Sequence, residues 1–479
     1  MSSGSPPPPL VVGFDLDMTL IDTVPGFRTM LRLLGEEFAV ELPVEQLISK
    51  LGPPLDHLLT PYLPADRIDA AVDRFRVLYP DHAIRSVPAL PGAVEALAAV
   101  RRHRGRVLVV TGKFTANAQL HVDHLRLEVD LLEGKVWGVG KGEVLRREGA
   151  SIYVGDHVHD VEGALAAGAL SVSVLTGGCT RAELEAAGTH VVLEDLGQFP
   201  AWLDDHLLAT RLAALEADLQ QRGSVMVAYS GGADSAFLLA AAVRALGADR
   251  VVAATGYSDS LPLRERDPAA QFAADLGVRL MTPRTHEMDR EGYRANGPDR
   301  CFFCKAELLE TLVPLAREHG LAHVATGTNA DDAVAGFRPG IRAADERGAI
   351  APLRDAGLTK AQVREASRRW RLPTWDKPAA ACLSSRVAYG VEVTPGRLAR
   401  VERAEDAARA LLAGAGVRNL RVRDLGDRAS IELDRALLPL DPALEERVVA
   451  AAVVAGFAEA VVDPRGFRSG SMNEALRRP

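Results

Sequence analysis

Cysteine is scarce in this sequence, with four residues in a chain of 479. So few thiols cannot supply the disulfide framework of a small secreted protein, and the cytoplasm is the compartment that we expect. Long apolar runs are also missing, since no stretch reaches the roughly 20 apolar residues of a membrane-spanning helix. Residues 1–9 have neither the charged nor the apolar region of a signal peptide, and their Ser/Gly/Pro composition predicts a disordered tail.

A strong excess of charge is lacking as well, since the formal net charge is −8 at pH 7. An acidic balance of this size gives no general attraction to nucleic acids or to anionic membranes. We therefore expect small-molecule partners rather than a large tRNA-binding surface. Hydrophobic residues make up 47% of the chain and charged residues 25%, which is typical of a globular protein. The length predicts about three domains.

The first part of the chain places two acidic residues directly after an apolar segment. The run L-V-V-G-F, which is typical of a buried strand, leads into Asp15 and Asp17. Because the side-chain period of a strand is two, both carboxylates project from the same face at the end of the strand. Such a pair can bind Mg²⁺, with one carboxylate attacking a phosphorus atom and the other handling the leaving-group proton.

Two further segments offer groups for a phosphate. A second apolar run ends in Thr111 and Gly112, whose hydroxyl and N–H can hold phosphate oxygens, and Lys141 begins a helical stretch and adds a positive charge. Lys113 competes with Lys141 for this role. We favour Lys141 because of its position in the order of the motifs.

A third apolar run ends in Asp156, with Asp160 four residues further on. Residues 10–205 resemble the haloacid-dehalogenase superfamily of phosphohydrolases, whose four motifs these segments match in order. The resemblance implies that residues 23–87 are an inserted helical cap on a Rossmann-like core. It also implies Asp15 as nucleophile, Asp17 as general acid/base, Thr111, Gly112 and Lys141 as phosphate ligands, and Asp15, Asp17, Asp156 and Asp160 around Mg²⁺.

A glycine-rich turn opens the second part of the chain. An apolar run ends at residue 229, Ser230, Gly231 and Gly232 follow, and a helical Ala/Leu pattern begins at once. Two glycines allow several N–H groups to point at one anion at a helix N-terminus. The turn contains no lysine, so it is not a Walker loop. The sequence S-G-G-A-D-S resembles the loop of the ATP pyrophosphatases.

Strands and helices alternate after this turn, which predicts a doubly wound parallel sheet with the ligand at the carboxyl ends of the strands. Thr255 and Gly327 each end a predicted strand, next to the nucleotide. The predicted ATP-binding residues are Ser230, Gly231, Gly232, Asp234, Ser235, Thr255 and Gly327.

Residues 210–479 resemble the LarE family of ATP-dependent sulfurtransferases, which make the nickel-pincer nucleotide. The resemblance rests on motifs that occur in order, including R-C-F-F-C-K at 300–305 and L-P-T-W-D-K-P-A-A-A-C-L-S-S-R at 372–386. It implies that a pyridinium dicarboxylate mononucleotide is adenylated and that the carboxylate becomes a thiocarboxylate. It further implies a homo-oligomer, supplied with sulfide or another sulfur donor.

Three of the four cysteines lie in these motifs, namely Cys301, Cys304 and Cys382. The resemblance implies that they bind a [4Fe–4S] cluster with one open iron. A zinc site remains an alternative, and so does a Cys382 that donates its own sulfur. A thiolate or sulfide needs an electropositive surrounding, which Lys305 and Arg386 can supply.

The sequence therefore predicts an α/β chain with a phosphohydrolase domain at 10–205, an ATP pyrophosphatase domain at 206–387 and a small α+β domain at 388–479. In the last domain, Arg421 and Arg423 share one face of a strand and are candidates to clamp substrate carboxylates or phosphate. We expect a bifunctional enzyme. The alternatives are a tRNA thiolase that shares the nucleotide loop, and an N-terminal half that only regulates its partner. The substrate of the phosphohydrolase stays open.

Overall fold

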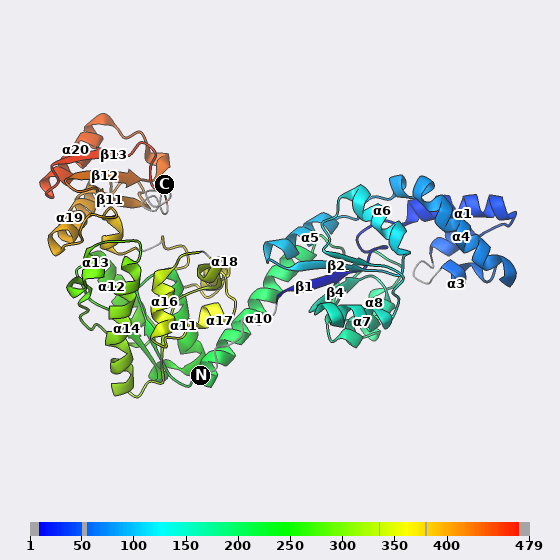
Figure 1. Ribbon diagram of the computed structural model, residues 1–479, viewed down its shortest axis with the longest axis horizontal. Helices are drawn as coiled ribbons and strands as arrows, with labels where there is room; N and C mark the ends of the chain where they lie inside the picture. The colour runs from blue at the N-terminus through cyan, green and yellow to red at the C-terminus, as the bar shows by residue number, and fades with distance from the viewer. Residues whose placement is uncertain (1–8, 50–54, 335, 379–380, 469–479) are drawn as a thin grey trace. The chain divides into compact units, whose positions relative to one another are not determined.

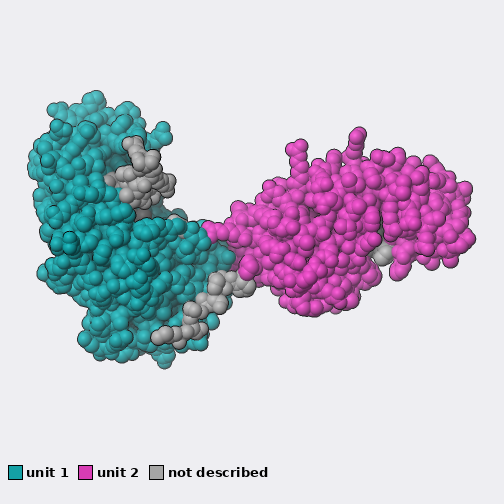
Figure 2. All heavy atoms as spheres, in the orientation of Figure 1, with its two compact units in different colours: residues 1–7, 208–479 teal, residues 8–207 magenta. Residues whose placement is uncertain are grey.

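The computed structural model describes residues 9–49, 55–334, 336–378 and 381–468. The chain forms two compact units, one of residues 8–207 and one that includes residues 208–479 (Figure 2). Helix α10 (Phe199–Arg222) begins in the first unit and ends in the second. No helix in the described ranges is long and apolar enough to cross a membrane. Of the tail predicted at residues 1–9, all but Pro9 lies outside the described residues.

The first unit is built around a parallel sheet in the order β3-β2-β1-β4-β5-β6 (Figure 1). Its strands are β1 (Val11–Phe14), β2 (Arg106–Val110), β3 (Leu131–Glu133), β4 (Ile152–Gly155), β5 (Leu170–Val174) and β6 (Val191–Leu193). Both faces of the sheet are buried, because Val12 and Phe14 pack into one core and Val11 into another. The strand order reverses between β1 and β4, and a ligand site is expected at such a point.

The helices of the first unit fall into two groups. Between β1 and β2 come α1 (Val24–Phe38), α2 (Val44–Ile48), α3 (Leu55–Leu59) and α4 (Ala65–His82), followed by α5 (Ala93–Arg102). Helices α1 to α4 enclose a core of their own, in which the rings of Phe27 and Phe75 meet edge to face at 5.8 Å. The remaining helices are α6 (Thr115–Leu125), α7 (Gly140–Glu148), α8 (Val158–Ala167) and α9 (Arg181–Ala186).

The second unit contains a parallel sheet in the order β10-β7-β8-β9. Its strands are β7 (Val225–Ala228), β8 (Val251–Ala254), β9 (Arg279–Met281) and β10 (His323–Thr326). Its helices are α11 (Ala233–Leu246), α12 (Arg266–Asp275), α13 (Glu291–Arg294), α14 (Arg300–Glu318), α15 (Ala330–Val334), α16 (Pro339–Glu346), α17 (Pro352–Asp355) and α18 (Lys360–Arg369). Val225 and Val227 face a core with α11, and Met226 faces a core with α14, so this sheet too is covered on both sides.

A small mixed sheet ends the chain. Strand β11 (Leu420–Asp424) pairs antiparallel with β12 (Arg428–Leu433), which pairs in parallel with β13 (Glu459–Val462). Helices α19 (Pro395–Leu411) and α20 (Pro442–Val454) pack with these strands around a core that includes Val401, Val422 and Val448. The fold class predicted from the sequence, two parallel-sheet α/β regions followed by a small α+β region, is confirmed.

Candidate active sites

Three aspartates of the first unit bring their carboxylates together at the carboxyl ends of β1 and β4. Asp15, Asp156 and Asp160 are buried, and one oxygen of each lies within 4.8 Å of the others. Asp15 follows β1 directly, and its N–H donates to the carbonyl of Val154 over 2.8 Å. Asp160 lies in the first turn of α8, which follows β4. Carboxylate oxygens at this spacing fit a Mg²⁺ ion.

Two lysines partner the acidic residues separately. The Nζ of Lys141 lies 2.7 Å from Oδ1 of Asp15 and 2.6 Å from Oδ1 of Asp160. The Nζ of Lys113 lies 2.5 Å from Oδ1 of Asp17, which also accepts a hydrogen bond from the hydroxyl of Thr23. The structure thus places Lys141 with the three clustered carboxylates, and Asp17, which the sequence predicts as a fourth Mg²⁺ ligand, outside their cluster.

Burial and mutual repulsion dominate the electrostatics of this site. Burial raises the pKa of Asp15 to about 7, and the charges of Asp160 and Asp17 add to the rise while Lys141 opposes it. The pKa of Asp156 is raised well above its ordinary value by burial and by its acidic neighbours. For Asp17, burial raises the pKa, but the charge and hydrogen bond of Lys113 and the hydrogen bond of Thr23 together outweigh it and lower the pKa. A divalent cation among the three clustered carboxylates would stabilise their ionised forms.

Some groups of this site have only weak signals in the sequence. The hydroxyl of Thr19 donates to Oδ1 of Asp156 over 2.8 Å. In the sequence, only the position of Thr19 in the D-x-D-x-T pattern indicates a role in this site. A Cβ on Gly177 would lie 1.8 Å from Oδ2 of Asp156, so a side chain at position 177 would displace that carboxylate. Thr111 is buried at the end of β2, and Gly112 follows it.

The glycine-rich turn of the second unit connects β7 to α11. Gly231 has a φ of +71°, a conformation that favours glycine, and α11 begins directly after Gly232. The hydroxyl of Ser235 accepts from the N–H of Ser230 over 3.2 Å and lies 3.2 Å from the carbonyl of Gly232, to which it donates. These bonds fix a turn whose N–H groups gather at the N-terminus of a fourteen-residue helix.

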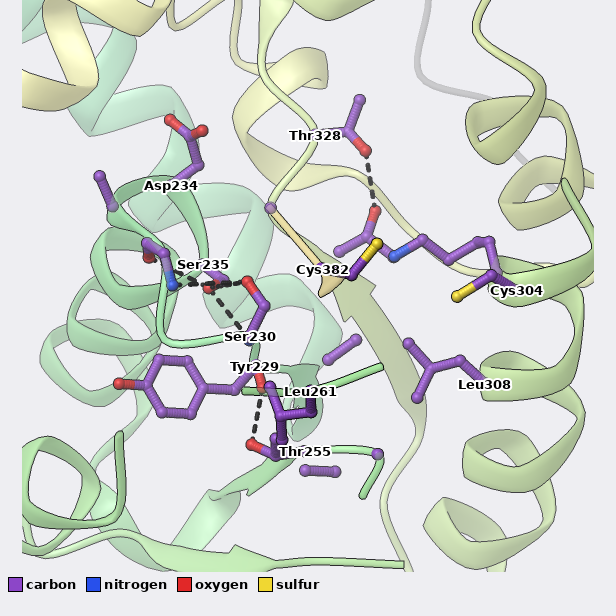
Figure 3. Close-up of a pocket in the computed structure, with 18 of the residues that line it drawn as sticks. Tyr229, Ser230, Asp234, Ser235, Thr255, Leu261, Cys304, Leu308, Thr328 and Cys382 are labelled. Carbon is purple, nitrogen blue, oxygen red and sulfur yellow. Dashed lines mark hydrogen bonds between the residues drawn. The ribbon is translucent and has the colours of Figure 1, made fainter. Parts of the chain in front are cut away.

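The turn lines a cavity of about 440 Å³, drawn in Figure 3. Thr255 lies at the end of β8, with its hydroxyl donating to the carbonyl of Tyr229 over 2.7 Å. Gly327 follows β10, where a Cβ would lie 2.8 Å from the backbone nitrogen of Ser235. The predicted ATP-binding residues at this cavity are Ser230, Gly232, Asp234, Ser235, Thr255 and Gly327. Gly231 belongs to the turn itself.

Asp234 carries the acidic group of this turn. Its Oδ1 is buried and has no hydrogen-bond partner among the described residues, and burial raises its pKa. The nearest cation is Lys360, whose Nζ lies 3.9 Å from Oδ2. A carboxylate placed in this way suits a metal ion that accompanies a polyphosphate.

Two of the predicted cysteines line the same cavity. Cys304 lies in the first turns of α14 and Cys382 directly before the turn Leu383–Arg386, and both side chains are partly buried (Figure 3). Cys301 lies one helical turn before Cys304 and is exposed. Burial, together with the nearby thiol of Cys382, raises the pKa of Cys304. Burial also lowers the pKa of Lys305, which lines the cavity as well.

The distances between the three thiols test whether Cys301, Cys304 and Cys382 could bind zinc. Within the described part of the chain, the three aspartates are the only group of three or more such ligands whose atoms all lie within 4.8 Å of one another, so the three sulfur atoms are not all within that distance. Tetrahedral zinc with bonds of about 2.3 Å needs sulfur atoms about 3.8 Å apart. The described thiols are therefore not arranged as a preformed zinc site.

A second cavity, of about 220 Å³, is strongly basic. Its cationic lining residues are Arg264, Lys377, Arg386, Arg409, Arg418 and Arg421. Burial and the charge of Arg386 lower the pKa of Arg421 to about 10, so an anion bound here would relieve repulsion. Lys377 and Pro378 line both cavities, so the basic cavity adjoins the cavity at the glycine-rich turn.

The predicted substrate-binding arginines differ in their surroundings. Arg386 is buried, donates to the carbonyl of Cys382 over 2.8 Å and forms an ion pair with Glu405 at 2.9 Å. Arg423 lies 2.7 Å from Glu432 and does not line the basic cavity. Of these three predicted arginines, Arg421 combines a position in that cavity with a lowered pKa, and Arg409, which the sequence did not predict, shares both properties. Sequence reasoning missed Arg264, Arg409 and Arg418.

Comparisons with known proteins divide the chain in the same way. Residues 12–165 match the family described as haloacid dehalogenase-like hydrolase, and residues 143–199 match the HAD-hydrolase-like family. A solved structure, the haloacid dehalogenase-like hydrolase family protein SP0104 from Streptococcus pneumoniae, is 22% identical, with a TM-score of 0.38 over 41% of this chain and 98% of that one.

Two curated proteins are similar to more than half of the chain. Uncharacterized protein slr1717 of Synechocystis sp. (strain ATCC 27184 / PCC 6803 / Kazusa) is 39% identical over 273 residues, which cover 56% of this chain and 99% of the relative. The pyridinium-3,5-bisthiocarboxylic acid mononucleotide synthase of Lactiplantibacillus plantarum is 34% identical over 269 residues, which cover 56% of this chain and 96% of the relative.

Proposed function

Because the chain belongs, through its C-terminal part, to the family of the Lactiplantibacillus plantarum pyridinium-3,5-bisthiocarboxylic acid mononucleotide synthase, we propose that it is a bifunctional enzyme. The C-terminal part uses ATP to transfer sulfur to a pyridinium dicarboxylate mononucleotide. The N-terminal part is a haloacid dehalogenase-like hydrolase domain, and it hydrolyses a phosphomonoester. Both reactions take small molecules, and we place the enzyme in the cytoplasm as a homo-oligomer.

The phosphohydrolase reaction uses the two aspartates after β1 in different roles. The carboxylate of Asp15 attacks the phosphorus atom, the P–O ester bond breaks, and Asp17 gives a proton to the leaving oxygen. Asp17 then takes a proton from the water that hydrolyses the aspartyl-phosphate. Lys141, with the hydroxyl of Thr111 and the N–H of Gly112, holds the phosphate oxygens. Mg²⁺ bound by Asp15, Asp156 and Asp160 would supply positive charge for those oxygens.

The first reaction of the C-terminal part is adenylation. A carboxylate oxygen of the substrate attacks the α-phosphorus of ATP, and the bond to pyrophosphate breaks. The glycine-rich turn holds the β- and γ-phosphates as one unit, because its N–H groups converge at the N-terminus of α11. Asp234 binds the accompanying Mg²⁺. Thr255, at the end of β8, places backbone groups against the adenine.

The second reaction replaces oxygen with sulfur. A sulfur nucleophile attacks the acyl carbon, and AMP leaves with the original carboxylate oxygen. Cys301, Cys304 and Cys382 would hold a [4Fe–4S] cluster, which supplies a sulfide at an iron without a protein ligand. The raised pKa of Cys304 indicates that its thiol needs a nearby cation or metal to ionise. Arg421 and the basic cavity bind an anionic group of the substrate.

One observation carries the proposal: the glycine-rich turn, Cys304 and Cys382 line a single cavity. An activated carboxylate made at the turn is therefore within reach of sulfur without leaving the protein.

The test is product analysis with ATP and the pyridinium dicarboxylate mononucleotide. AMP and pyrophosphate are expected, and Asp234→Ala should lose at least about 90% of pyrophosphate release, since it removes a metal ligand. Asp249→Ala, on the loop before β8, is the matched control and should keep full activity. ADP and phosphate as main products would exclude this reaction class.

A further inference from the structure

An exposed tryptophan lies beside the phosphate-binding residues of the hydrolase unit. Trp137 is 37% exposed, although an indole is among the side chains that gain most from burial. A Cβ on Gly112 would lie 3.4 Å from Cδ1 of Trp137. The indole is therefore adjacent to the residue that is assigned to hold phosphate.

Backbone hydrogen bonds fix this tryptophan segment against the phosphate-binding segment. The N–H of Lys135 donates to the carbonyl of Lys113 over 2.9 Å, and the N–H of Val136 donates to the carbonyl of Thr111 over 3.0 Å. Residues on both sides of Gly112 are thus bonded to residues just before Trp137. These bonds hold the backbone that carries Trp137 in place beside Gly112.

The other side of the segment packs on helix α8. The ring centre of Trp137 lies 4.0 Å from that of His159, whose Nδ1 lies 2.8 Å from Oε2 of Glu162. Gly138 has a φ of +53°, and its carbonyl would lie 3.0 Å from a Cβ on Gly163, so the two backbones approach closely. An aromatic face held in this way costs little further entropy when a ligand stacks on it.

We propose that the phosphatase site selects nucleoside 5′-monophosphates and that Trp137 stacks on the aromatic ring of the nucleotide. The inference rests on the proposed phosphatase function and adds its substrate class. The reaction breaks the bond between phosphorus and the 5′-oxygen, water supplies the new oxygen of phosphate, and a proton goes to the 5′-oxygen. Electron-poor rings stack well on an indole, and a cationic ring gains from its π-face as well.

Two sources supply such a nucleotide in the proposed chemistry. One is AMP, which each adenylation releases, and the other is a pyridinium mononucleotide. Both combine a planar ring, a ribose and a 5′-phosphate. Ribose 5-phosphate has the same sugar and phosphate but no ring, which makes it the matched control substrate.

The experiment measures phosphate release by the full chain with Mg²⁺, using AMP, nicotinic acid mononucleotide and ribose 5-phosphate. Both nucleotides should exceed ribose 5-phosphate in kcat/KM by about tenfold or more, as expected for one base stacked on an aromatic side chain. Trp137→Ala should remove this preference by raising KM for the two nucleotides, and it should leave kcat/KM for ribose 5-phosphate unchanged. Trp137→Phe should keep most of it. Val139→Ser, at a residue 66% exposed in the same segment, should change neither.

The outcomes separate the two claims. The inference is overturned if Trp137→Ala loses activity equally on all three substrates, or if wild type turns over ribose 5-phosphate as well as the nucleotides. In either case the phosphatase assignment stands as long as Asp15→Asn loses hydrolysis. Activity with none of the three, while a generic phosphomonoester is hydrolysed by wild type and not by Asp15→Asn, overturns the inference alone. No hydrolysis of any phosphomonoester, or hydrolysis unchanged by Asp15→Asn, overturns the phosphatase assignment and the inference with it. Between the nucleotides, a higher kcat/KM for AMP identifies the adenylation product as the source, and the reverse identifies the pyridine nucleotide.

Discussion

Two lysines of the hydrolase unit form ion pairs with different aspartates of the candidate phosphatase site. Among the described carboxylates, Lys141 pairs with Asp15 and Asp160, whereas Lys113 pairs with Asp17. The nucleophile and the acid/base therefore have different cations, and their pKa values move in opposite directions, up for Asp15 and down for Asp17. These shifts oppose the proposed roles, an ionised nucleophile and an acid that carries a proton, so bound Mg²⁺ near Asp15 and a substrate phosphate near Asp17 would have to reverse them.

Replacing the nucleophile tests this assignment. Asp15→Asn keeps the size of the side chain and removes the attacking oxygen anion, so phosphomonoester hydrolysis should fall at least about a thousandfold. Asp69→Asn, at an exposed position of α4, is the control and should stay within twofold, about 0.4 kcal/mol. Phosphate release under Mg²⁺ measures both. Wild-type rates in Asp15→Asn would remove Asp15 from the mechanism.

The buried pair of Arg386 and Glu405 makes a prediction about stability. Burial alone would raise the pKa of Glu405, but Arg386 and Arg264 outweigh it and the pKa is lowered. A lowered pKa in the folded state adds stability above the unfolded value of about 4.3, and this stability is lost as the pH falls through the folded value. Glu405→Gln leaves a buried guanidinium without its ion pair, which should cost about 3–5 kcal/mol at pH 7.

Urea unfolding of the full chain, followed by a signal from the second unit, measures that loss. The difference between wild type and Glu405→Gln should shrink as the pH falls below about 4, because the wild-type carboxylate then becomes neutral as well. Glu446→Gln, on the exposed side of α20, should have no effect. An unchanged unfolding midpoint in Glu405→Gln would show that the pair adds nothing to stability.

At the scale of elements, strand ends carry most of the chemistry that the sequence predicts. Asp15, Asp156 and Gly327 all follow apolar runs, and such runs identify the carboxyl edge of a parallel sheet without a structure. The sequence cannot show contacts made by packing between distant segments. The phenol of Tyr79 on α4, for instance, lies 2.9 Å from Nε2 of His121 on α6, and nothing near either residue predicts that pair.

The basic cavity shows the same limit. Arg264 and Arg409 lie on different elements, far apart in the sequence, and meet only because α19 packs beside the turn that holds Arg386. A charge count gives −8 for the chain and so conceals this local concentration of arginines. Periodicity locates elements, whereas the side-chain clusters between elements depend on the packing.

The turn before α11 makes a prediction about backbone conformation. Gly231→Ala puts a Cβ at a φ of +71°, 3.2 Å from the Cβ of Ala269, and should lower pyrophosphate release by about tenfold or more as the N–H groups turn away from the phosphates. Gly223→Ala is the matched control, with a φ of +77° and no atom within 4 Å of the new Cβ. It carries the same strain outside the turn. Equal rates in the two variants would show that the conformation of Gly231 does not matter for catalysis.

Helix α14 and the turn after Cys382 make a prediction about iron. Protein reconstituted without oxygen should bind about four irons per chain. Cys301→Ala, Cys304→Ala and Cys382→Ala should each lose most of them, since only three thiolates hold the cluster. Cys179→Ala, in the other unit, should keep full iron content. Iron analysis and absorbance spectra measure this, and colourless protein with dehydroalanine at position 382 after turnover would favour the sacrificial cysteine.

At the scale of the whole molecule, the chain combines two units with separate hydrophobic cores and separate candidate sites. Each site lies within one unit, the aspartate cluster in residues 8–207 and the cysteine cavity in residues 208–479. Each also has its own acidic groups, the cluster that includes Asp15 in the first and Asp234 at the glycine-rich turn in the second. The account therefore requires that each reaction can be abolished without the other.

One measurement tests this requirement most directly. The full chain, Asp15→Asn and Asp234→Ala are each given ATP, the pyridinium dicarboxylate mononucleotide and a sulfide source, and pyrophosphate and the thiocarboxylate product are followed by mass spectrometry. Hydrolysis of AMP is followed in parallel. Asp15→Asn should keep pyrophosphate and thiocarboxylate formation and lose AMP hydrolysis, and Asp234→Ala should show the reverse. Loss of both activities in either variant, or pyrophosphate release without any thiocarboxylate, would contradict a bifunctional sulfurtransferase and phosphatase.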